Sequence, residues 1–252
     1  MNSGPTHRRA THDFELVAET EEYAVVEKPP FLLVHPTKPG GPRTLWSELR
    51  NLFAFEIANG GQVSIVNRLD RETSGLMLIA KTSAAARRFG LLMQAQRIGK
   101  EYLAVVWGWP DWDSTTVDAP IARAGEFGPS PIWLKQAIHP SGAQALTEFV
   151  VAERFVRAGE RFAIVRAIPQ TGRTHQIRVH LASLGHAIVG DKIYGPDENY
   201  YLQFIETGWT PELERALRLP RHALHSSRLK VDESESWESG LPSDLKSWIE
   251  AQ

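Results

Sequence analysis

The most informative absence in this sequence is that of cysteine, which occurs at none of its 252 positions. Without thiols, the chain can form neither disulfide bonds nor thiolate-ligated metal sites. No apolar run approaches the roughly 20 residues that a membrane-spanning helix needs. The polar, basic start MNSGPTHRRATH also lacks the apolar core of a secretion signal. We therefore expect a cytoplasmic protein in which residues 1–13 form a flexible N-terminus.

An excess of positive charge is also missing, since the formal net charge of the chain is −2. The distribution is uneven, however. Residues 197–252 carry 11 acidic and 6 basic side chains, which leaves 19 acidic and 22 basic ones for residues 1–196. A local basic surface that binds an anionic partner is compatible with this pattern. Scattered, solvated charge is equally compatible with it.

Short strand-like segments are the main feature of what is present. Apolar residues make up 42% of the chain and charged residues 23%, as in globular proteins with a buried core. Strand-forming residues cluster at 14–17, 23–27, 76–80, 101–107, 146–152 and 162–168. Capping residues and apolar spacing predict helices beginning at Thr44, Ser83 and Thr174, and a short one over 211–217. Because strands outnumber helices and do not alternate with them, we expect an α+β fold with a mainly antiparallel mixed sheet flanked by helices and a central cleft. Residues 14–252 are expected to form one domain, with 196–222 as a surface excursion.

The first chemically informative segment is VNRLDRETSGL at residues 66–76, which places Asp70 between two arginines. A Thr-Ser-Gly turn and an apolar run follow, so a ligand can reach the carboxylate beside a buried strand. Neighbouring guanidinium groups would keep that carboxylate ionised, as nucleophilic attack requires. The same residues would also suit a surface loop held by salt bridges.

Two further segments carry candidate residues. Tyr102 lies within a predicted strand, where an aromatic side chain commonly packs into the core. The segment QTGRTHQIRVH at 170–180 places Arg178 in the first turn of a predicted helix capped by Thr174. A cation there opposes the helix dipole, which indicates a partner anion. His175 and His180 are five residues apart, and on a helix that spacing separates them, unlike a zinc-binding i, i+4 pair.

Together these segments resemble the RluA family of pseudouridine synthases. VNRLDRETSGLMLIAKT is similar to the family's catalytic motif, usually written HRLD-x-x-T-S-G. KEYLAVVWG resembles its tyrosine motif, and TGRTHQIRVHLASLGHAIVGDKIYG its arginine motif. EKPPFLLVHP and ALHSSRL, at 27–36 and 223–229, also resemble family segments. The resemblance therefore extends over residues 14–231.

The resemblance implies a role for each matching position. It makes Asp70 the catalytic aspartate, Arg178 the arginine paired with it, and Tyr102 the residue that stacks on the target base and is a candidate for deprotonating C5. The remaining implied positions, which contact or orient RNA, are Arg68, Asn67, Arg173 and His175. The chain departs from the family at Asn67, where the usual residue is histidine, and we expect an altered RNA contact there. A small N-terminal RNA-binding domain, found in many relatives, is not expected.

The implied activity is isomerisation of uridines in structured RNA to pseudouridine. Ribosomal and transfer RNA are both open as substrates, with ribosomal RNA favoured. The target nucleotide must leave its stack to react. Asp70 would then attack C1′ or remove a 2′ proton, and these two routes stay open. Bonds broken and formed balance, so neither a metal nor another cofactor is expected, and we expect a monomer. The alternatives are a non-catalytic RNA-binding module on the same fold and a glycosidase, which normally needs a second acidic group.

Overall fold

The structure, a computed structural model, describes residues 14–38, 40–232 and 235–251. The expected flexible segment 1–13 lies outside these residues. The strands are β1 (Glu15–Glu19), β2 (Tyr23–Lys28), β3 (Ser64–Ile65), β4 (Ser74–Ala80), β5 (Ile98–Trp107), β6 (Ser114–Asp118), β7 (Ile121–Arg123), β8 (Gln136–Ile138), β9 (Leu146–Arg157), β10 (Glu160–Pro169), β11 (Leu224–Val231) and β12 (Glu235–Glu238). The helices are α1 (Leu45–Leu52), α2 (Ala54–Ala58), α3 (Ser83–Gln94), α4 (Gln176–Ser183), α5 (Asn199–Thr207), α6 (Pro211–Leu217) and α7 (Ser243–Glu250), with a 3₁₀ turn at Ala124–Glu126.

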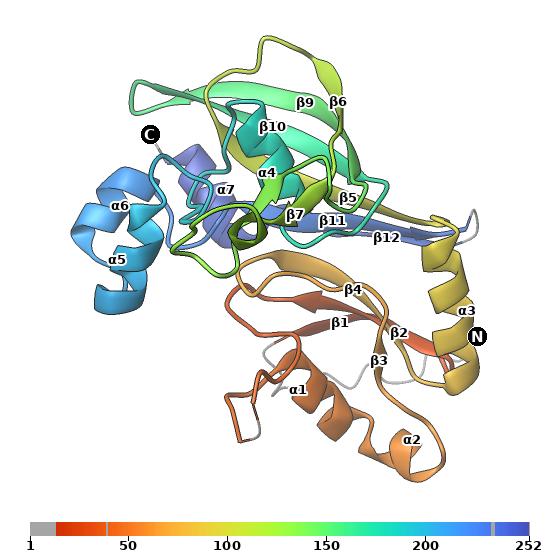
Figure 1. Cartoon of the computed structure of the whole chain (residues 1–252). Coiled ribbons are helices and arrows are strands. Elements are labelled where there is room, and N and C mark those ends of the chain that lie inside the picture. The colour runs from red at the N-terminus through yellow and green to blue at the C-terminus, as the bar shows by residue number, and fades with distance from the viewer. Residues whose placement is uncertain (1–13, 39, 233–234, 252) are drawn as a thin grey trace.

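One large sheet organises the molecule (Figure 1). Its strand order is β1-β2-β4-β11-β5-β10-β9-β6, with β12 beside β11 and β3 beside β4. Strands β4 and β11 pair in parallel, while the neighbouring pairs on either side, β2–β4 and β11–β5, are antiparallel. The expected α+β fold with a mainly antiparallel mixed sheet is therefore confirmed. A separate two-stranded sheet joins β7 to β8.

The centre of the sheet is rigid because β4 is buried along its whole length. Met77 and Ile79 face the larger apolar cluster, which includes Leu45 and Leu49 of α1. Leu76 and Leu78 face the opposite cluster, which includes Phe89 of α3. Alternate side chains of a strand point to opposite faces, so both faces of β4 are packed. The loop that enters β4 consequently starts from a fixed support.

The predicted helices form, with a difference at the start of α3. Thr44 caps α1 as expected, accepting a hydrogen bond from the Ser47 backbone. Helix α3 is capped by Thr82, not by Ser83 as predicted, because Thr82 has the extended backbone that directs its hydroxyl to the amide of Ala85. The short helix predicted over 211–217 is α6, whose cap is Thr210. Helices α2, α5 and α7 were not predicted.

The helices lie around different parts of the sheet. In Figure 1, α1 and α2 lie below β1, β2 and β4, and α5 and α6 stand together at the left of the view. Helix α4 contacts β8, β9 and β10 in the upper half. No helix among the described residues is long and apolar enough to cross a lipid bilayer.

Candidate active site

Asp70 lies in the turn between β3 and β4. Its carbonyl oxygen accepts a hydrogen bond from the Thr73 amide at 3.2 Å, which closes the turn. Gly75 follows with a φ of 110°, and a Cβ atom there would lie 2.3 Å from the Ser226 carbonyl oxygen on β11. Glycine is therefore required for β4 to approach β11 this closely. The Asp70 side chain itself is 31% exposed, so a substrate can reach it.

Arg178 connects this turn to helix α4. Its Nη1 donates to Asp70 Oδ2 at 2.9 Å, across 108 residues of sequence. Its Nε and Nη2 donate to the two carboxylate oxygens of Asp191, at 2.6 and 2.9 Å. Asp191 Oδ1 also accepts from the amides of Ile193 and Tyr194, at 3.0 and 3.1 Å. Arg178 is thus a bridge between two carboxylates, and Asp191 holds it in a bidentate pair.

These contacts set the charges in the site. Burial alone would raise the pKa of Asp70, but the Arg178 guanidinium lowers it below its usual value. Burial disfavours a charged Arg178, but Asp191 and then Asp70 raise its pKa. Arg178 also lowers the pKa of Asp191, against the effect of burial. Asp70 is consequently an ionised carboxylate at neutral pH.

Tyr102, on β5, lies beside the same carboxylate. Burial and the negative charge of Asp70 raise the pKa of its phenol, and a hydrogen bond with the Ser226 side chain lowers it in part. Only 8% of Tyr102 is exposed. In the antiparallel register, Tyr102 pairs with Ser226 on β11 and with Ala167 on β10. The ring therefore comes from the middle of the sheet, and its hydroxyl stays protonated.

The Asp70 turn is fastened from two sides by residues that the sequence patterns did not single out. On one side, Lys28 at the end of β2 is fully buried, and its ammonium donates to the carbonyls of Pro29, Leu32 and Arg71, at 2.7, 3.1 and 3.1 Å. On the other side, His222 lies 2.7 Å from the Thr73 hydroxyl. These contacts fix the backbone immediately after Asp70.

Glu72 extends this second anchor. Its carboxylate accepts hydrogen bonds from Lys192, at 2.8 and 3.0 Å, and from the amide of His222 at 3.2 Å. Lys28, Asp191 and Lys192 each lie inside a segment that resembles the family, in EKPP and GDKIYG. Their positions were therefore visible in the sequence, but their partners, far away along the chain, were not.

The other predicted site residues fall into different environments. Arg68 and Arg173 are exposed, and Arg173 Nε donates to the Gln144 carbonyl at 2.9 Å. His175 reaches the site, with Nε2 3.9 Å from Asp70 Oδ2. Asn67 is only 4% exposed, and its carboxamide accepts from the Leu78 amide at 2.7 Å and donates to the Leu76 carbonyl at 3.3 Å. Both groups of that carboxamide are thus directed at β4.

The start of helix α4 differs from the prediction. Its N-cap is His175, not Thr174, and it has a left-handed backbone with φ 57° and ψ 15°. No side chain caps the helix amides, and Gln176 Oε1 instead accepts from the Arg173 amide, in the segment that precedes the helix, at 2.9 Å. His180 faces away from the site and bonds to Thr147 and to the Ala119 carbonyl. Among the described residues, no group of three or more histidine or acidic side chains is arranged to hold a metal ion.

Known proteins resemble this chain in both sequence and fold. Residues 22–183 match the family model described as RNA pseudouridylate synthase. Ribosomal large subunit pseudouridine synthase D of Nitrosomonas europaea is 32% identical over 255 residues, which cover 98% of this chain and 67% of the relative. The protein of that name from Pseudomonas aeruginosa is 37% identical over 239 residues, 92% of this chain and 70% of the relative. A solved structure, human RNA pseudouridylate synthase domain containing 1, has a TM-score of 0.68 at 27% identity and covers 100% of this chain and 90% of its own.

Proposed function

Since this chain belongs to the RNA pseudouridylate synthase family, in its RluA group, we propose that Asp70 is the carboxylate with which it isomerises uridine. The enzyme is an RNA pseudouridine synthase. The observation that carries the assignment to Asp70 is the 2.9 Å contact between its Oδ2 and Arg178 Nη1. That contact keeps a partly exposed carboxylate ionised beside a buried tyrosine.

The reaction that this site would support conserves all atoms. The target uridine leaves its stack and enters the site, as base-modifying enzymes require. The bond between N1 and C1′ breaks, and positive character develops on the ribose, where an ionised carboxylate stabilises it. Asp70 either attacks C1′ or takes a 2′ proton. The uracil turns, C5 bonds to C1′, the C5 proton leaves and N1 gains a proton.

We propose that Tyr102 acts mainly as a platform for the uracil. Its raised pKa opposes the phenolate form that removal of the C5 proton would need. A neutral phenol beside Asp70 can still donate a hydrogen bond. We assign Arg178 to holding Asp70, and propose that the exposed Arg68 and Arg173 contact the RNA backbone.

Asn67 is assigned differently from the sequence-based expectation. An RNA contact there would require its carboxamide to leave the β4 backbone, which would expose two unsatisfied backbone groups. We therefore propose that Asn67 fixes the entry into β4. His175 is close enough to Asp70 to act within the site instead of at the RNA surface.

We propose that the substrate is RNA of the large ribosomal subunit, because the curated relatives carry that substrate in their names. A ribosomal substrate would place the enzyme in the cytoplasm, and fractionation would test this. We further propose that residues 14–252 act as one catalytic domain, supported by a single sheet with strands from Glu15 to Glu238. A monomer is proposed, and light scattering would test it. A non-catalytic RNA-binding module is not favoured, because the chain belongs to a family of enzymes.

The decisive experiment maps pseudouridine in large-subunit RNA from cells with the gene, without it, and with Asp70→Asn in its place. We expect at least one uridine to be converted only with the wild-type gene. The product should have the mass of the substrate, and no free uracil should appear. Conversion by Asp70→Asn would refute the role of Asp70, and an unchanged map in cells without the gene would refute the ribosomal substrate.

A further inference from the structure

Three groups from separate parts of the chain form a line that ends at Asp70. The amide of Gln136, on β8, donates to the Tyr194 hydroxyl at 2.8 Å. That hydroxyl lies 2.9 Å from His175 Nδ1. The other ring nitrogen of His175, Nε2, lies 3.9 Å from Asp70 Oδ2. Two short contacts therefore join a backbone amide outside the site to an imidazole whose far nitrogen faces the Asp70 carboxylate.

The groups on either side of the His175 ring favour one neutral form of the imidazole. The Gln136 amide can only donate, so the Tyr194 hydroxyl accepts from it and keeps its own proton available. The one ring atom within reach of that proton is Nδ1 of His175. The negative Asp70 carboxylate faces Nε2 and favours a proton on that nitrogen, so in a neutral imidazole Nδ1 accepts from the Tyr194 hydroxyl. Burial, together with Arg178, lowers the pKa of His175 to about 4, so the ring is neutral at physiological pH.

The backbone holds the ring in this position. His175 has φ 57° and ψ 15°, in the left-handed region that costs energy for a residue with a side chain. Its side chain is 9% exposed, and its ring meets that of Tyr194 edge-on, at 5.6 Å and 82°. A strained, buried residue that caps no helix amide with its side chain indicates a function other than capping.

The guanidinium of Arg178 and the imidazole of His175 approach the same oxygen of Asp70. Arg178 Nη1 donates to Oδ2, and His175 Nε2 is also nearest to Oδ2. Among the described residues, no hydrogen-bond donor is recorded on Oδ1. We propose that Tyr194 and His175 are positioning residues that present an N–H group to Oδ2 of Asp70 and thereby leave Oδ1 as the oxygen that meets the ribose. This inference rests on the proposed function.

In this arrangement His175 transfers no proton. A neutral N–H dipole orients the carboxylate without cancelling its charge, whereas an imidazolium would form an ion pair and weaken it as a nucleophile or base. Loss of the Tyr194 hydroxyl would let the imidazole proton move to Nδ1. A lone pair on Nε2 would then face the negative oxygen, and the carboxylate would turn away from its productive orientation.

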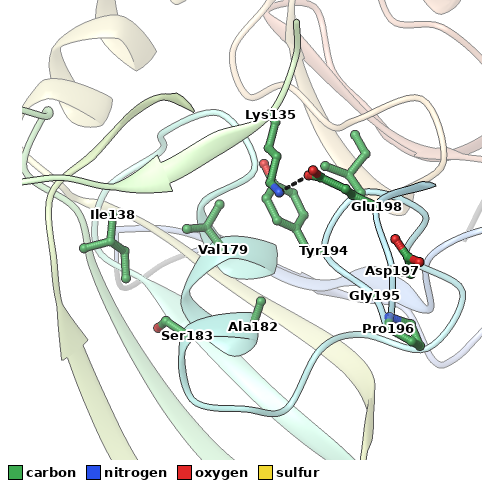
Figure 2. A pocket seen from close by; sticks show the side chains of 11 residues that line it. Lys135, Ile138, Val179, Ala182, Ser183, Tyr194, Gly195, Pro196, Asp197 and Glu198 are labelled. Atoms are coloured by element: carbon green, nitrogen blue, oxygen red, sulfur yellow. Dashed lines mark hydrogen bonds and ion pairs between the residues drawn. The ribbon is translucent and has the colours of Figure 1, made fainter. Parts of the chain in front are cut away.

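Tyr194 also lies at the wall of a cavity of about 480 Å³, and Asp70 is not among the residues that line it. Figure 2 shows Lys135, just before β8, extending beside Tyr194 to its ion pair with Glu198. The hairpin that carries Gln136 is thereby tied to the segment that follows Tyr194. The Gln136 amide on this hairpin donates to the Tyr194 hydroxyl, which also contacts His175 Nδ1.

The test replaces the hydroxyl and retains the ring. For Tyr194→Phe we expect kcat to fall by about 10-fold or more, the effect of losing about one oriented hydrogen bond, with KM for RNA changed less than about 2-fold. ¹⁵N NMR of the His175 ring should show the Nε2–H form in the wild type and a mixture of both neutral forms in the variant. Tyr201→Phe, on α5, is the matched control and should leave both readouts unchanged.

Two substitutions of His175 distinguish the position of the donor nitrogen from tolerance of the left-handed backbone. Asparagine tolerates the left-handed backbone, but its amide nitrogen reaches only to the position of Nδ1. The amide nitrogen of glutamine reaches approximately to that of Nε2. We therefore expect His175→Gln to retain more activity than His175→Asn. A wild-type ring protonated on Nδ1, wild-type kcat in Tyr194→Phe, or equal activity of the two His175 variants would overturn the inference. If the wild type modified no RNA, the proposed function would be refuted. The NMR spectrum would still test which ring nitrogen of His175 carries the proton.

Discussion

Asp191 and Asp70 share the guanidinium of Arg178 unequally. Asp191 accepts two hydrogen bonds from it, at 2.6 and 2.9 Å, and Asp70 accepts one at 2.9 Å. Asp191 is fully buried, whereas the Asp70 side chain is 31% exposed. The first carboxylate therefore balances the buried cation, and the second is held by it but remains open to a substrate.

Asp70→Asn should abolish pseudouridine formation and leave the fold intact, because the pair between Arg178 and Asp191 remains balanced. Asp191→Asn should instead lower the free energy of unfolding by about 3–5 kcal/mol, since it breaks a fully buried ion pair. Chemical denaturation of both variants measures the difference. Equal losses of stability would show that Asp191 does not balance the buried Arg178 more than Asp70 does.

Arg178→Lys should lose both activity and stability, although it keeps the positive charge. A single ammonium cannot make the bidentate pair with Asp191 and also reach Asp70. We expect turnover to fall by about 100-fold or more, a loss of roughly 3 kcal/mol in transition-state stabilisation. Arg87→Lys, at an exposed arginine of helix α3, is the control. Turnover near the wild-type value in Arg178→Lys would mean that a point charge suffices.

Tyr102→Phe should keep RNA affinity and lower turnover, whereas Tyr102→Ala should lower both. The phenyl ring preserves stacking on a base, which is worth about 1–3 kcal/mol per base in RNA-binding proteins. The two losses can be separated by measuring RNA binding and single-turnover rates for each variant. If Tyr102→Phe turns over like the wild type, the hydroxyl has no part in the reaction.

Acidification should destabilise the protein well above the range where carboxylates titrate. Burial is the first cause that lowers the pKa of His175 and of His225 to about 4, from 6.5. Below pH 6.5 the unfolded chain therefore binds more protons than the folded one, and stability falls as pH decreases towards 4. At pH 5 each of these histidines should cost roughly 2 kcal/mol. Calorimetry between pH 7 and pH 5 should show a falling Tm, and a constant Tm would contradict the neutral, buried state of these rings.

Asn67 and Arg68 are neighbours with opposite expected behaviour. Asn67→Ala should lower the free energy of unfolding by about 1–3 kcal/mol, because the Leu78 amide and Leu76 carbonyl lose their partner. RNA affinity of the folded variant should be unchanged. Arg68→Ala should leave stability within about 0.5 kcal/mol, weaken RNA binding and reduce its salt dependence by about one phosphate contact. The reverse pattern would return Asn67 to the RNA interface.

Local features of the sequence were sufficient for the class of fold and for the segments that carry chemistry. Periodicity located β4, β5, β9 and β10 within a few residues, because these strands depend on apolar side chains that are close together in sequence. The Thr44 cap located α1 for the same reason. Helices α2, α5 and α7 were missed because none of them has a side-chain cap at its start. The aromatic Phe204 of α5 contacts Lys192 only in the folded chain.

The composition and ordered motifs of this chain determined that it has an α+β fold and which segments carry its chemistry. The partners of those residues were decided by tertiary structure alone. Parallel pairing of β4 with β11 and the placement of α4 bring Arg178 to Asp70 across 108 residues. The same packing turns Asn67 inward and places Tyr194 against His175. Hydrogen bonds and buried charges act over a few ångströms of space, and sequence separation carries no information about that distance.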